Sequence, residues 1–345
     1  MDQQVVGRGH ALRQGAPAGS KRRFIFRAFG LLALPVVPRV AAQSARKLRV
    51  AWVSADRRNS PSPNLAAFAE GMRNLGYVEG KSLTIETWWG EGSGERLIQS
   101  ANDMVRSQPD VIVAAGGLAV YALTRAAVKL PIVFSMSADP VEAKVVQSFA
   151  HPGGNLTGIS LFTLALMGKR IQVLKEALPG IKRIAVIANP QHPGEPQERH
   201  AAQDAASALD LTMRYFPVQS EAELETALSD IRRGRDDAVV AFADGFTLGF
   251  AGRLAAFSLQ SRIPVIDGWA SFARQGNFLT YGPVIEDVYR RLALYVDKIG
   301  KGARPEDLPV ELPTTVELVI NVRTAKAIGL MVPRSLLLRA DELVQ

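Results

Sequence analysis

Two short stretches of the sequence, Asp110-Val-Ile-Val-Ala114 and Asp237-Ala-Val-Val-Ala241, decide the fold. Each is an apolar run that begins with an aspartate, and each is followed by a segment with helical spacing. Two further runs then correspond, Leu130-Pro-Ile-Val133 and Ile263-Pro-Val-Ile266. Continuous Val/Ile runs separated by helices are typical of buried parallel strands. The repeat therefore predicts an α/β protein with two similar lobes, although unrelated α/β units could also match by chance.

Outward from these runs, short apolar stretches alternate with segments of helical spacing from Leu48 onward. For a first lobe, residues 48–158, this pattern predicts strands at 48–54, 83–88, 110–115 and 132–135 and helices at 64–76, 95–107 and 119–129. For a second lobe, residues 159–276, it predicts strands at 183–188, 212–216, 237–242 and 264–266 and helices at 164–178, 200–209, 221–232 and 248–260. Residues 277–345 are too few for a third domain. We expect their strand (278–281), helix (285–299), extended segment (309–322) and short helix ending near residue 342 to complete one or both lobes.

The composition excludes several classes of protein. The 345 residues contain no cysteine, which rules out disulfide scaffolds, thiolate zinc sites, iron–sulfur clusters and cysteine nucleophiles. The net charge is +8, but residues 1–42 hold seven basic side chains against one acid, Asp2, which leaves +2 for the rest of the chain. We expect no nucleic-acid partner, because the basic surface that such a protein needs is missing.

The N-terminus has the three parts of a cleavable export signal. A basic run, Ser20-Lys-Arg-Arg-Phe-Ile-Phe-Arg27, leads into the apolar residues 28–37, and Val40-Ala-Ala42 supplies small residues for a peptidase. The paired arginines resemble a twin-arginine signal, although a general secretory signal can also contain two arginines. A membrane anchor is the alternative, but this apolar run is about half of the roughly 20 residues that a spanning helix needs. We expect residues 1–42 to be a signal peptide and the mature protein to lie in the periplasm.

The sequence contains no signature of an enzyme or of a metal site. Three histidines follow the export signal, His151, His192 and His200, and no two of them have the four-residue spacing of a helical metal site. There is no Gly-x-Ser-x-Gly elbow, and the glycine-rich segment 90–94 lacks the lysine of a phosphate loop. We therefore expect no catalytic residue, no bound metal and no cofactor.

Polar residues directly after the predicted strands are the better functional clue. The carboxyl ends of parallel strands in two facing lobes meet at a shared cleft, where open α/β sheets bind ligands. The candidates for this position are Ser54, Asp56, Gly116, Gly117, Ser135, Ser137, Asp139, Asn189, Asp244 and Asp267. The amides of Gly116 and Gly117 would hold an anionic group, and Asp244 or Asp267 a cationic or hydroxyl group. Each polar residue could instead be a helix N-cap, and the glycine pair only a tight turn.

A series of short motifs resembles a known family. The motifs follow one another as Gly76-Tyr-Val-Glu-Gly80, Pro131-Ile-Val-Phe134, Asp139-Pro-Val141, Pro152-Gly-Gly-Asn-Leu-Thr-Gly158, Tyr295-Val-Asp-Lys-Ile-Gly-Lys-Gly-Ala303, Asp307-Leu-Pro-Val-Glu311, Glu317-Leu-Val-Ile-Asn321, Thr324-Ala-Lys-Ala-Ile-Gly-Leu330 and Arg339-Ala-Asp-Glu342. Together, over residues 47–344, they resemble the tryptophan/tyrosine-type substrate-binding proteins of ABC transporters.

The resemblance implies a fold like that of type I periplasmic binding proteins. Two Rossmann-like lobes with parallel sheets would be joined by a multi-strand hinge and would close on a small solute. The family's binding positions correspond here to 54–56, Gly116 to Leu118, 137–139, Asn189, Asp244 and Asp267. The sequence departs from the family at Glu142-Ala-Lys144, at His151 and in the loop Gln191-His-Pro-Gly-Glu-Pro196. These departures concern the ligand rather than the fold.

We therefore expect a monomeric, extracytoplasmic solute-binding protein of an ABC importer. It would deliver a small organic solute, such as an amino acid or an aromatic compound, to an ABC permease in the inner membrane. One alternative is a periplasmic sensor that passes the closed state to a membrane receptor. Another is a two-lobed enzyme, which would need an acid–base pair in the cleft that the sequence does not identify.

If the protein is exported as expected, the signal peptide is removed from its N-terminus. The protein isolated from the periplasm is expected to begin near residue 43, because the small residues at Val40-Ala-Ala42 suit signal peptidase. N-terminal sequencing of the periplasmic fraction measures this directly. An intact 20–42 segment on a cytoplasmic protein would contradict the prediction.

Overall fold

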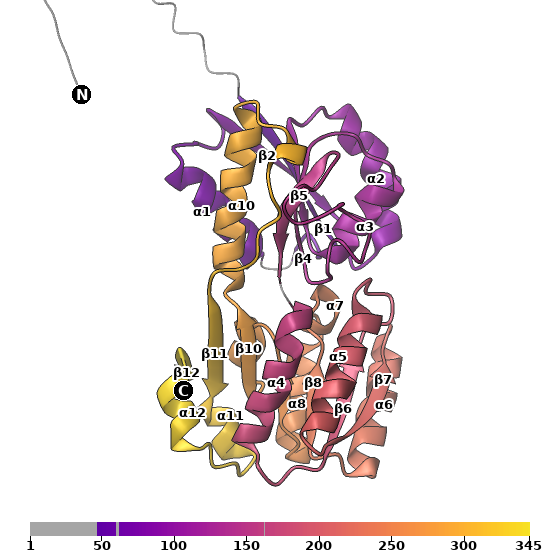
Figure 1. Cartoon of the computed structure of the whole chain (residues 1–345), viewed down its shortest axis with the longest axis vertical. Coiled ribbons are helices and arrows are strands. Elements are labelled where there is room, and N and C mark those ends of the chain that lie inside the picture. Colours follow the sequence, from indigo (N-terminus) through magenta and orange to yellow (C-terminus); the bar gives the residue numbers. More distant parts are fainter. Residues whose placement is uncertain (1–46, 60–61, 162) are drawn as a thin grey trace, which may run out of the picture. The chain divides into compact units, whose positions relative to one another are not determined.

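The computed structural model describes residues 47–59, 62–161 and 163–345. The expected signal peptide, residues 1–42, lies outside this part of the chain. Two parallel β-sheets, each covered by helices, make up the described residues (Figure 1). This arrangement confirms the predicted α/β class with two lobes of parallel sheets.

The first sheet has five parallel strands in the order β2-β1-β3-β4-β5. Its strands are β1 (Leu48–Ser54), β2 (Leu83–Trp89), β3 (Val111–Ala115), β4 (Ile132–Met136) and β5 (Leu156–Ser160). Helices α1 (Pro63–Asn74), α2 (Gly94–Arg106) and α3 (Gly117–Arg125) follow the first three strands. All five residues of β3 and of β4 are buried, as continuous Val/Ile runs predict. We call this sheet with its covering helices the first lobe.

The second sheet has seven strands in the order β12-β11-β10-β9-β8-β6-β7, and it forms the second lobe with its own helices. The strands are β6 (Arg183–Ala188), β7 (Thr212–Pro217), β8 (Ala238–Ala241), β9 (Val265–Asp267), β10 (Leu279–Pro283), β11 (Val316–Asn321) and β12 (Glu342–Val344). The helices are α4 (Thr163–Ala177), α5 (Glu195–Ala208), α6 (Glu221–Gly234), α7 (Gly245–Leu248), α8 (Ala251–Ser261), α9 (Ala270–Arg274), α11 (Val322–Ala327) and α12 (Arg334–Arg339). Only the β10–β11 pair of this sheet is antiparallel.

The chain passes between the two sheets three times. It leaves β5 for α4, leaves β10 for α10 (Ile285–Gly300), and returns to β11 after the short helix η1 (Pro305–Asp307). The last passage begins beside the first, because the Glu311 amide donates to the Gly158 carbonyl (3.0 Å) and the Ser160 amide donates to the Glu311 carbonyl (3.0 Å). The connection between the lobes is therefore built from several neighbouring segments.

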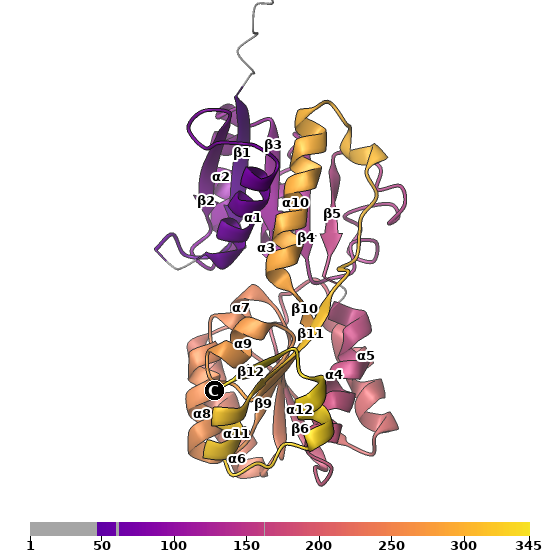
Figure 2. The ribbon, with the colours of Figure 1, turned by 90° about the vertical axis from the view of Figure 1, so that its left-hand side faces the viewer.

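Helix α10 lies beside α1 on the first sheet, although it follows a strand of the second (Figures 1 and 2). Its apolar face buries Val288, Tyr289, Leu292, Val296 and Ile299 in the same core cluster as Trp52 and Phe68. The rings of Trp52 and Tyr289 are 5.6 Å apart. This helix thus completes the core of the first lobe.

Several predicted elements need correction. Helix α5 begins at Glu195 rather than near residue 200, because Pro196 fits the first turn of a helix, where its missing N–H is not needed. The short helix predicted to end near residue 342 is α12, which already ends at Arg339, and residues 342–344 form strand β12, which pairs with β11 at the sheet edge. The helix predicted over 248–260 is α8, which begins at Ala251, and the short helix α7 before it was not predicted. Strand β5 and helix α9 were not predicted, because their short segments carry no clear periodicity.

Because α1 packs closely on α10, Gly71 of α1 is expected to be sensitive to substitution. A Cβ atom on Gly71 would lie 2.5 Å from the Arg290 carbonyl oxygen and 2.9 Å from the Ala293 Cβ. Gly71→Ala is therefore expected to lower the free energy of unfolding by about 1–3 kcal/mol, because the two helices must separate. The measurement is urea unfolding followed by tryptophan fluorescence.

Gly252, inside α8, is the matched control, since a Cβ there meets no atom within 4 Å. Gly252→Ala is expected to leave stability unchanged or to raise it by up to about 1 kcal/mol. Equal effects of the two substitutions would contradict the tight α1–α10 contact.

Candidate functional site

The predicted site residues lie at the carboxyl ends of strands in both sheets. Ser54 ends β1, the segment from Gly116 to Leu118 follows β3, and Ser137 and Asp139 follow β4. Asn189, Asp244 and Asp267 hold the corresponding places at β6, β8 and β9. Ser54, Ser137, Asn189, Asp244 and Asp267 are buried, whereas Asp56, Leu118 and Asp139 are half-buried.

Several of these residues use their polar atoms to hold local turns. Ser54 Oγ accepts the Asp56 amide (3.1 Å), and Asp139 Oδ1 accepts the amides of Val141 (2.8 Å) and Glu142 (3.1 Å). Asn189 Oδ1 accepts the Gln191 amide in the same way (3.0 Å). These three residues cap turns and not helices, whereas the helix N-cap that the sequence left open is present at Asp244, the N-cap of α7.

The glycine pair after β3 needs a correction. Gly116 has φ +93°, which favours glycine, and its amide donates to the Ser135 carbonyl oxygen (2.8 Å). That amide cannot also bind an anionic ligand group, contrary to the expectation for both glycines. The Gly117 amide, at the first residue of α3, is the remaining donor of the pair for an anion.

The second lobe gathers buried charges where β8 and β9 end. Arg170 of α4 is fully buried, and its field acts on Asp267 and on Glu198 of α5. Its Nε donates to the Tyr281 carbonyl oxygen (3.1 Å). Among the residues that the structure describes, Arg170 is the one buried Lys or Arg, whereas four acids are buried at this end of the sheet: Glu195, Glu198, Asp244 and Asp267. The site therefore has an excess of buried acid.

Each of three carboxyl groups in this cluster has one oxygen available. Asp244 Oδ1 accepts the Thr247 amide (2.7 Å) and caps α7, and Asp267 Oδ1 accepts the Trp269 amide (2.8 Å). The other oxygens, Asp244 Oδ2 and Asp267 Oδ2, together with Glu198 Oε1, have no hydrogen-bond partner among the described residues. A buried carboxyl oxygen without a partner destabilises the protein, and a donor from a ligand would satisfy it.

Burial governs the proton affinity of these groups. It raises the pKa of Glu198 to about 8 and that of Asp267 to about 7, although Arg170 opposes both shifts. Burial also raises the pKa of Asp244, against the effects of His192 and of the Thr247 hydrogen bonds. A cationic ligand group would favour the ionised carboxylates, so the cluster is suited to an ammonium group.

His192 is a site residue that the sequence did not indicate. It lies in the loop between β6 and α5, and its Nε2 is 2.6 Å from Ser137 Oγ of the first lobe. Its pKa is lowered by burial, while Asp244 and Glu195 act in the opposite direction. Arg170 and Glu198 were missed as well, because both lie within helices rather than directly after strands.

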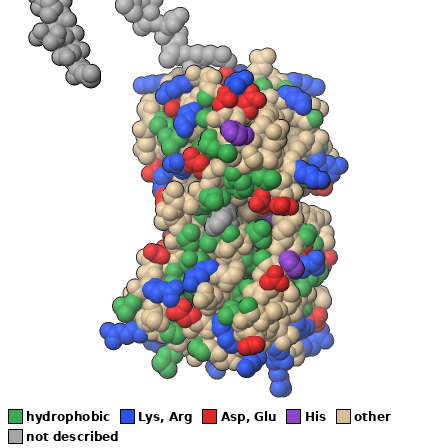
Figure 3. Space-filling view, viewed as in Figure 1, with side chains coloured by type: hydrophobic (Ala, Val, Ile, Leu, Met, Phe, Trp, Pro, Cys, Tyr) green, Lys and Arg blue, Asp and Glu red, His purple; other side chains and the backbone are tan. Residues whose placement is uncertain are grey.

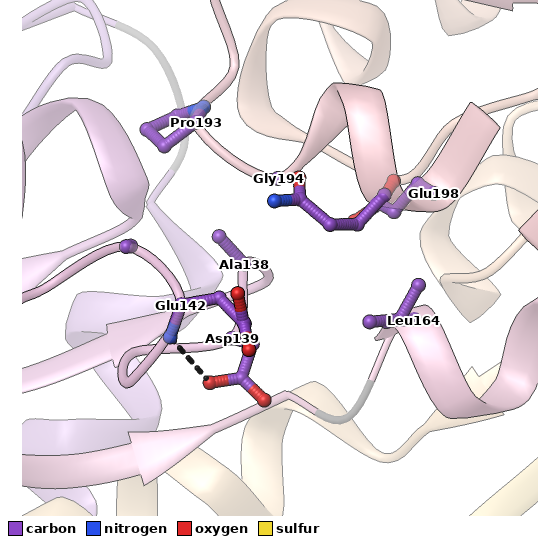
Figure 4. A pocket seen from close by; sticks show the side chains of 9 residues that line it. Ala138, Asp139, Glu142, Leu164, Pro193, Gly194 and Glu198 are labelled. Carbon is purple, nitrogen blue, oxygen red and sulfur yellow. Dashed lines mark hydrogen bonds between the residues drawn. The ribbon is translucent and has the colours of Figure 1, made fainter. Parts of the chain in front are cut away.

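A small cavity lies where the lobes meet (Figure 4). Its volume is about 10 Å³, which is near the lower limit for one water molecule. Ala138, Asp139 and Glu142 of the first lobe line it together with Gly194 and Glu198 of the second. The surface view shows acidic side chains near the same boundary, while the described lysines and arginines are scattered over this face (Figure 3). A second cavity, about 340 Å³, is bounded by α3, by 143–145 and by Pro193.

Comparison with known proteins identifies the family. The model of the ABC transporter substrate binding protein family matches residues 59–344. A tyrosine-binding protein of Clostridioides difficile is 22% identical over 263 residues, which are 76% of this chain and 75% of that protein. The chain belongs to the ABC transporter substrate binding protein family.

Solved structures share the fold. A conserved domain protein from Vibrio cholerae is 26% identical, with a TM-score of 0.78 over 87% of this chain and 99% of that one. An ABC domain from Streptococcus pneumoniae in complex with L-Trp is 20% identical, with a TM-score of 0.79 over 86% of this chain and 100% of that one. These matches confirm the type I-like periplasmic-binding-protein fold.

Membrane-spanning and metal-binding features were searched in the described ranges. None of the helices in 47–59, 62–161 and 163–345 combines the length and the apolar character needed to cross a membrane. Over the same ranges, His, Asp and Glu side chains form no group of three or more that could hold a metal ion.

The raised pKa values predict how stability changes with pH. The carboxyl of Glu198 has an ordinary pKa near 4.5 when unfolded and about 8 when folded, so between these values the folded protein holds a proton that the unfolded chain has lost. The free energy of unfolding should therefore fall as pH rises from about 4.5 to about 8, by at most about 1.4 kcal/mol per pH unit for this group. Asp267 acts in the same direction up to about pH 7.

Glu198→Gln is expected to flatten this decline, as measured by urea unfolding between about pH 5 and 8. Glu142→Gln is the matched control, because Glu142 lines the same cavity but is exposed. A decline of equal slope in Glu198→Gln and in the unsubstituted protein would contradict the assignment.

Proposed function

We propose that this protein binds a small zwitterionic solute, an amino acid with an aromatic side chain, between its lobes and delivers it to an ABC permease in the inner membrane. It would act in the periplasm as a monomer, with its signal peptide removed near Ala42. Family membership supports the role in an ABC transporter. The tyrosine-binding relative and the L-Trp complex support the class of solute.

The observation that carries the proposal is the pair of unpartnered oxygens, Asp244 Oδ2 and Asp267 Oδ2, in a cluster with an excess of buried acid. The ammonium group of an amino acid has three donors and one positive charge, and it would satisfy both needs. An uncharged solute would leave the buried acids without compensation.

The first lobe offers the complementary groups. Ser54, Ser135 and Ser137 are buried hydroxyl residues at the ends of β1 and β4, and the Gly117 amide begins α3. Hydroxyl and amide donors of this kind bind a carboxylate. Trp269 of the second lobe packs against the apolar cluster of the first lobe and would provide a wall for an aromatic ring.

Closure of the lobes would be the working step, and no catalysis or cofactor is required. A solute that touches both lobes makes its full set of contacts only when the lobes are closed, so it shifts the population toward that state. The permease would then recognise the closed form.

The proposal predicts the effect of neutralising one carboxylate. Asp244→Asn is expected to weaken binding of L-tyrosine or L-tryptophan roughly 10- to 150-fold, because a charge-assisted hydrogen bond is lost. Asparagine is as good an N-cap as aspartate, so the melting temperature should change little. Calorimetric titration beside thermal melting measures both quantities.

Asp237→Asn is the matched control, since Asp237 Oδ2 also accepts backbone amides, those of Lys182 (2.7 Å) and Arg183 (2.8 Å), but precedes β8 at the opposite end of the strand. It should keep the affinity of the unsubstituted protein. Unchanged affinity in Asp244→Asn and in Asp267→Asn would remove the carboxylates from the binding site. Failure of both amino acids to bind the unsubstituted protein would instead refute the class of solute.

A further inference from the structure

The loop after β6 contacts the opposite lobe. It is fixed from within the second lobe, because the Asn189 carbonyl oxygen accepts the His192 amide (3.0 Å) and the His192 carbonyl oxygen accepts the Glu195 amide (3.0 Å). These bonds join β6 to the start of α5 and hold His192 in one position. The loop therefore presents the imidazole to the first lobe as part of a rigid element.

Three residues of the first lobe lie against this loop. His192 Nε2 lies 2.6 Å from Ser137 Oγ, and a Cβ on Gly117 would be in contact with the imidazole at 3.7 Å. A Cβ on Gly194 would lie 2.9 Å from the Ala138 Cβ. The loop thus approaches the first lobe so closely that a side chain at position 194 would hold the lobes apart.

The hydrogen bonds of His192 define its protonation state. Its Nδ1 accepts the Gly194 amide (3.2 Å), so this nitrogen carries a lone pair and not a proton. The proton of the neutral ring is then on Nε2, which donates to Ser137 Oγ. A second proton on Nδ1 would face the Gly194 N–H and remove that bond.

We propose that His192 locks the two lobes in register and that only its neutral imidazole does so. The inference rests on the proposed function in one respect, namely that the lobes open and close. It assigns a role to the loop of residues 191–196, which is distinct from solute recognition by Asp244 and Asp267.

The proposal fixes the direction of a pH effect. In open lobes the imidazole is in water, with an ordinary pKa near 6.5, whereas burial lowers the pKa in the closed state. Closure therefore excludes a proton, and the closed population should decrease as pH falls below about 6.5. The acids that face the ring, Asp244 and Glu195, reduce this effect without reversing it. Glu198 and Asp267, whose pKa values burial raises to about 8 and about 7, also take up protons over this pH range, so the comparison of His192→Gln with the unsubstituted protein isolates the histidine.

The test uses the full mature chain without added solute. Because the protein contains no cysteine, the exposed residues Lys129 and Gln203 can be replaced by cysteine to carry one fluorophore on each lobe. Single-molecule energy transfer then gives the ratio of closed to open molecules at about pH 7.5 and about pH 5.5. His200→Gln, at an exposed histidine, is the matched control.

Three substitutions separate the hydrogen bond from the titration. His192→Gln retains a donor for Ser137 but cannot be protonated, so its closed population should match the unsubstituted protein at about pH 7.5 and no longer decrease at about pH 5.5. His192→Ala and Ser137→Ala should lower the closed-to-open ratio about 2- to 12-fold at the higher pH.

The proposal is overturned if His192→Gln keeps the full pH response or if His192→Ala leaves the ratio unchanged. The same measurement with saturating L-tryptophan distinguishes failure of the lock from failure of the proposed function. Closure by the amino acid in all variants, with no effect of position 192, refutes the lock alone. A single population that neither pH, amino acid nor substitution alters refutes both.

Discussion

Burial of the apolar face of α10 is the interaction on which the two-lobed arrangement depends. This helix follows β10 of the second sheet, yet Val288, Leu292 and Val296 belong to the core of the first lobe. To reach that core the chain must cross between the lobes, and to reach β11 it must cross back. Because three neighbouring passages join the lobes, they restrict how one lobe can turn against the other. That restriction keeps the carboxyl ends of both sets of strands directed at one boundary.

The two sides of this boundary differ in their chemistry. The first lobe presents neutral donors, such as Ser54 and Ser137, while the second presents buried acids around Arg170. Neither lobe alone would be a complete binding site for a zwitterion, because neither offers groups for both the positive and the negative charge of the solute. In the proposed function, the positive group of the solute would be recognised by the lobe that also carries His192. The electrostatic coupling of His192 with Asp244 would then connect closure with charge recognition.

The sequence was sufficient for most of the strands and for their polar ends, but not for β5, for β12 or for the buried charges. Strands such as β1 and β6 were predicted with their observed bounds, because continuous apolar runs report burial directly. Asp244 was found for the same local reason, since it follows a strand and caps a helix. Arg170 and Glu198 lie on helices whose local pattern gives no sign of burial, and it is tertiary packing, of α4 on α5 and on β10, that removes them from water. The start of α5 was predicted too late in the chain because Pro196 indicated a loop, so the position of His192 directly before a helix was missed.

The position of α10 in the chain also sets an order of events during synthesis. The strands of the first lobe, up to Ser160, leave the ribosome well before residues 285–300 exist. The second sheet can gather most of its strands during that interval, which is on the order of 10 s at roughly 5–20 residues per second. Until then α1 covers the face of β1 that carries Trp52, and the apolar face of α10 is missing from that core. The lobe that is made first is therefore completed late, and the part of its apolar core that α10 will cover stays exposed throughout the delay.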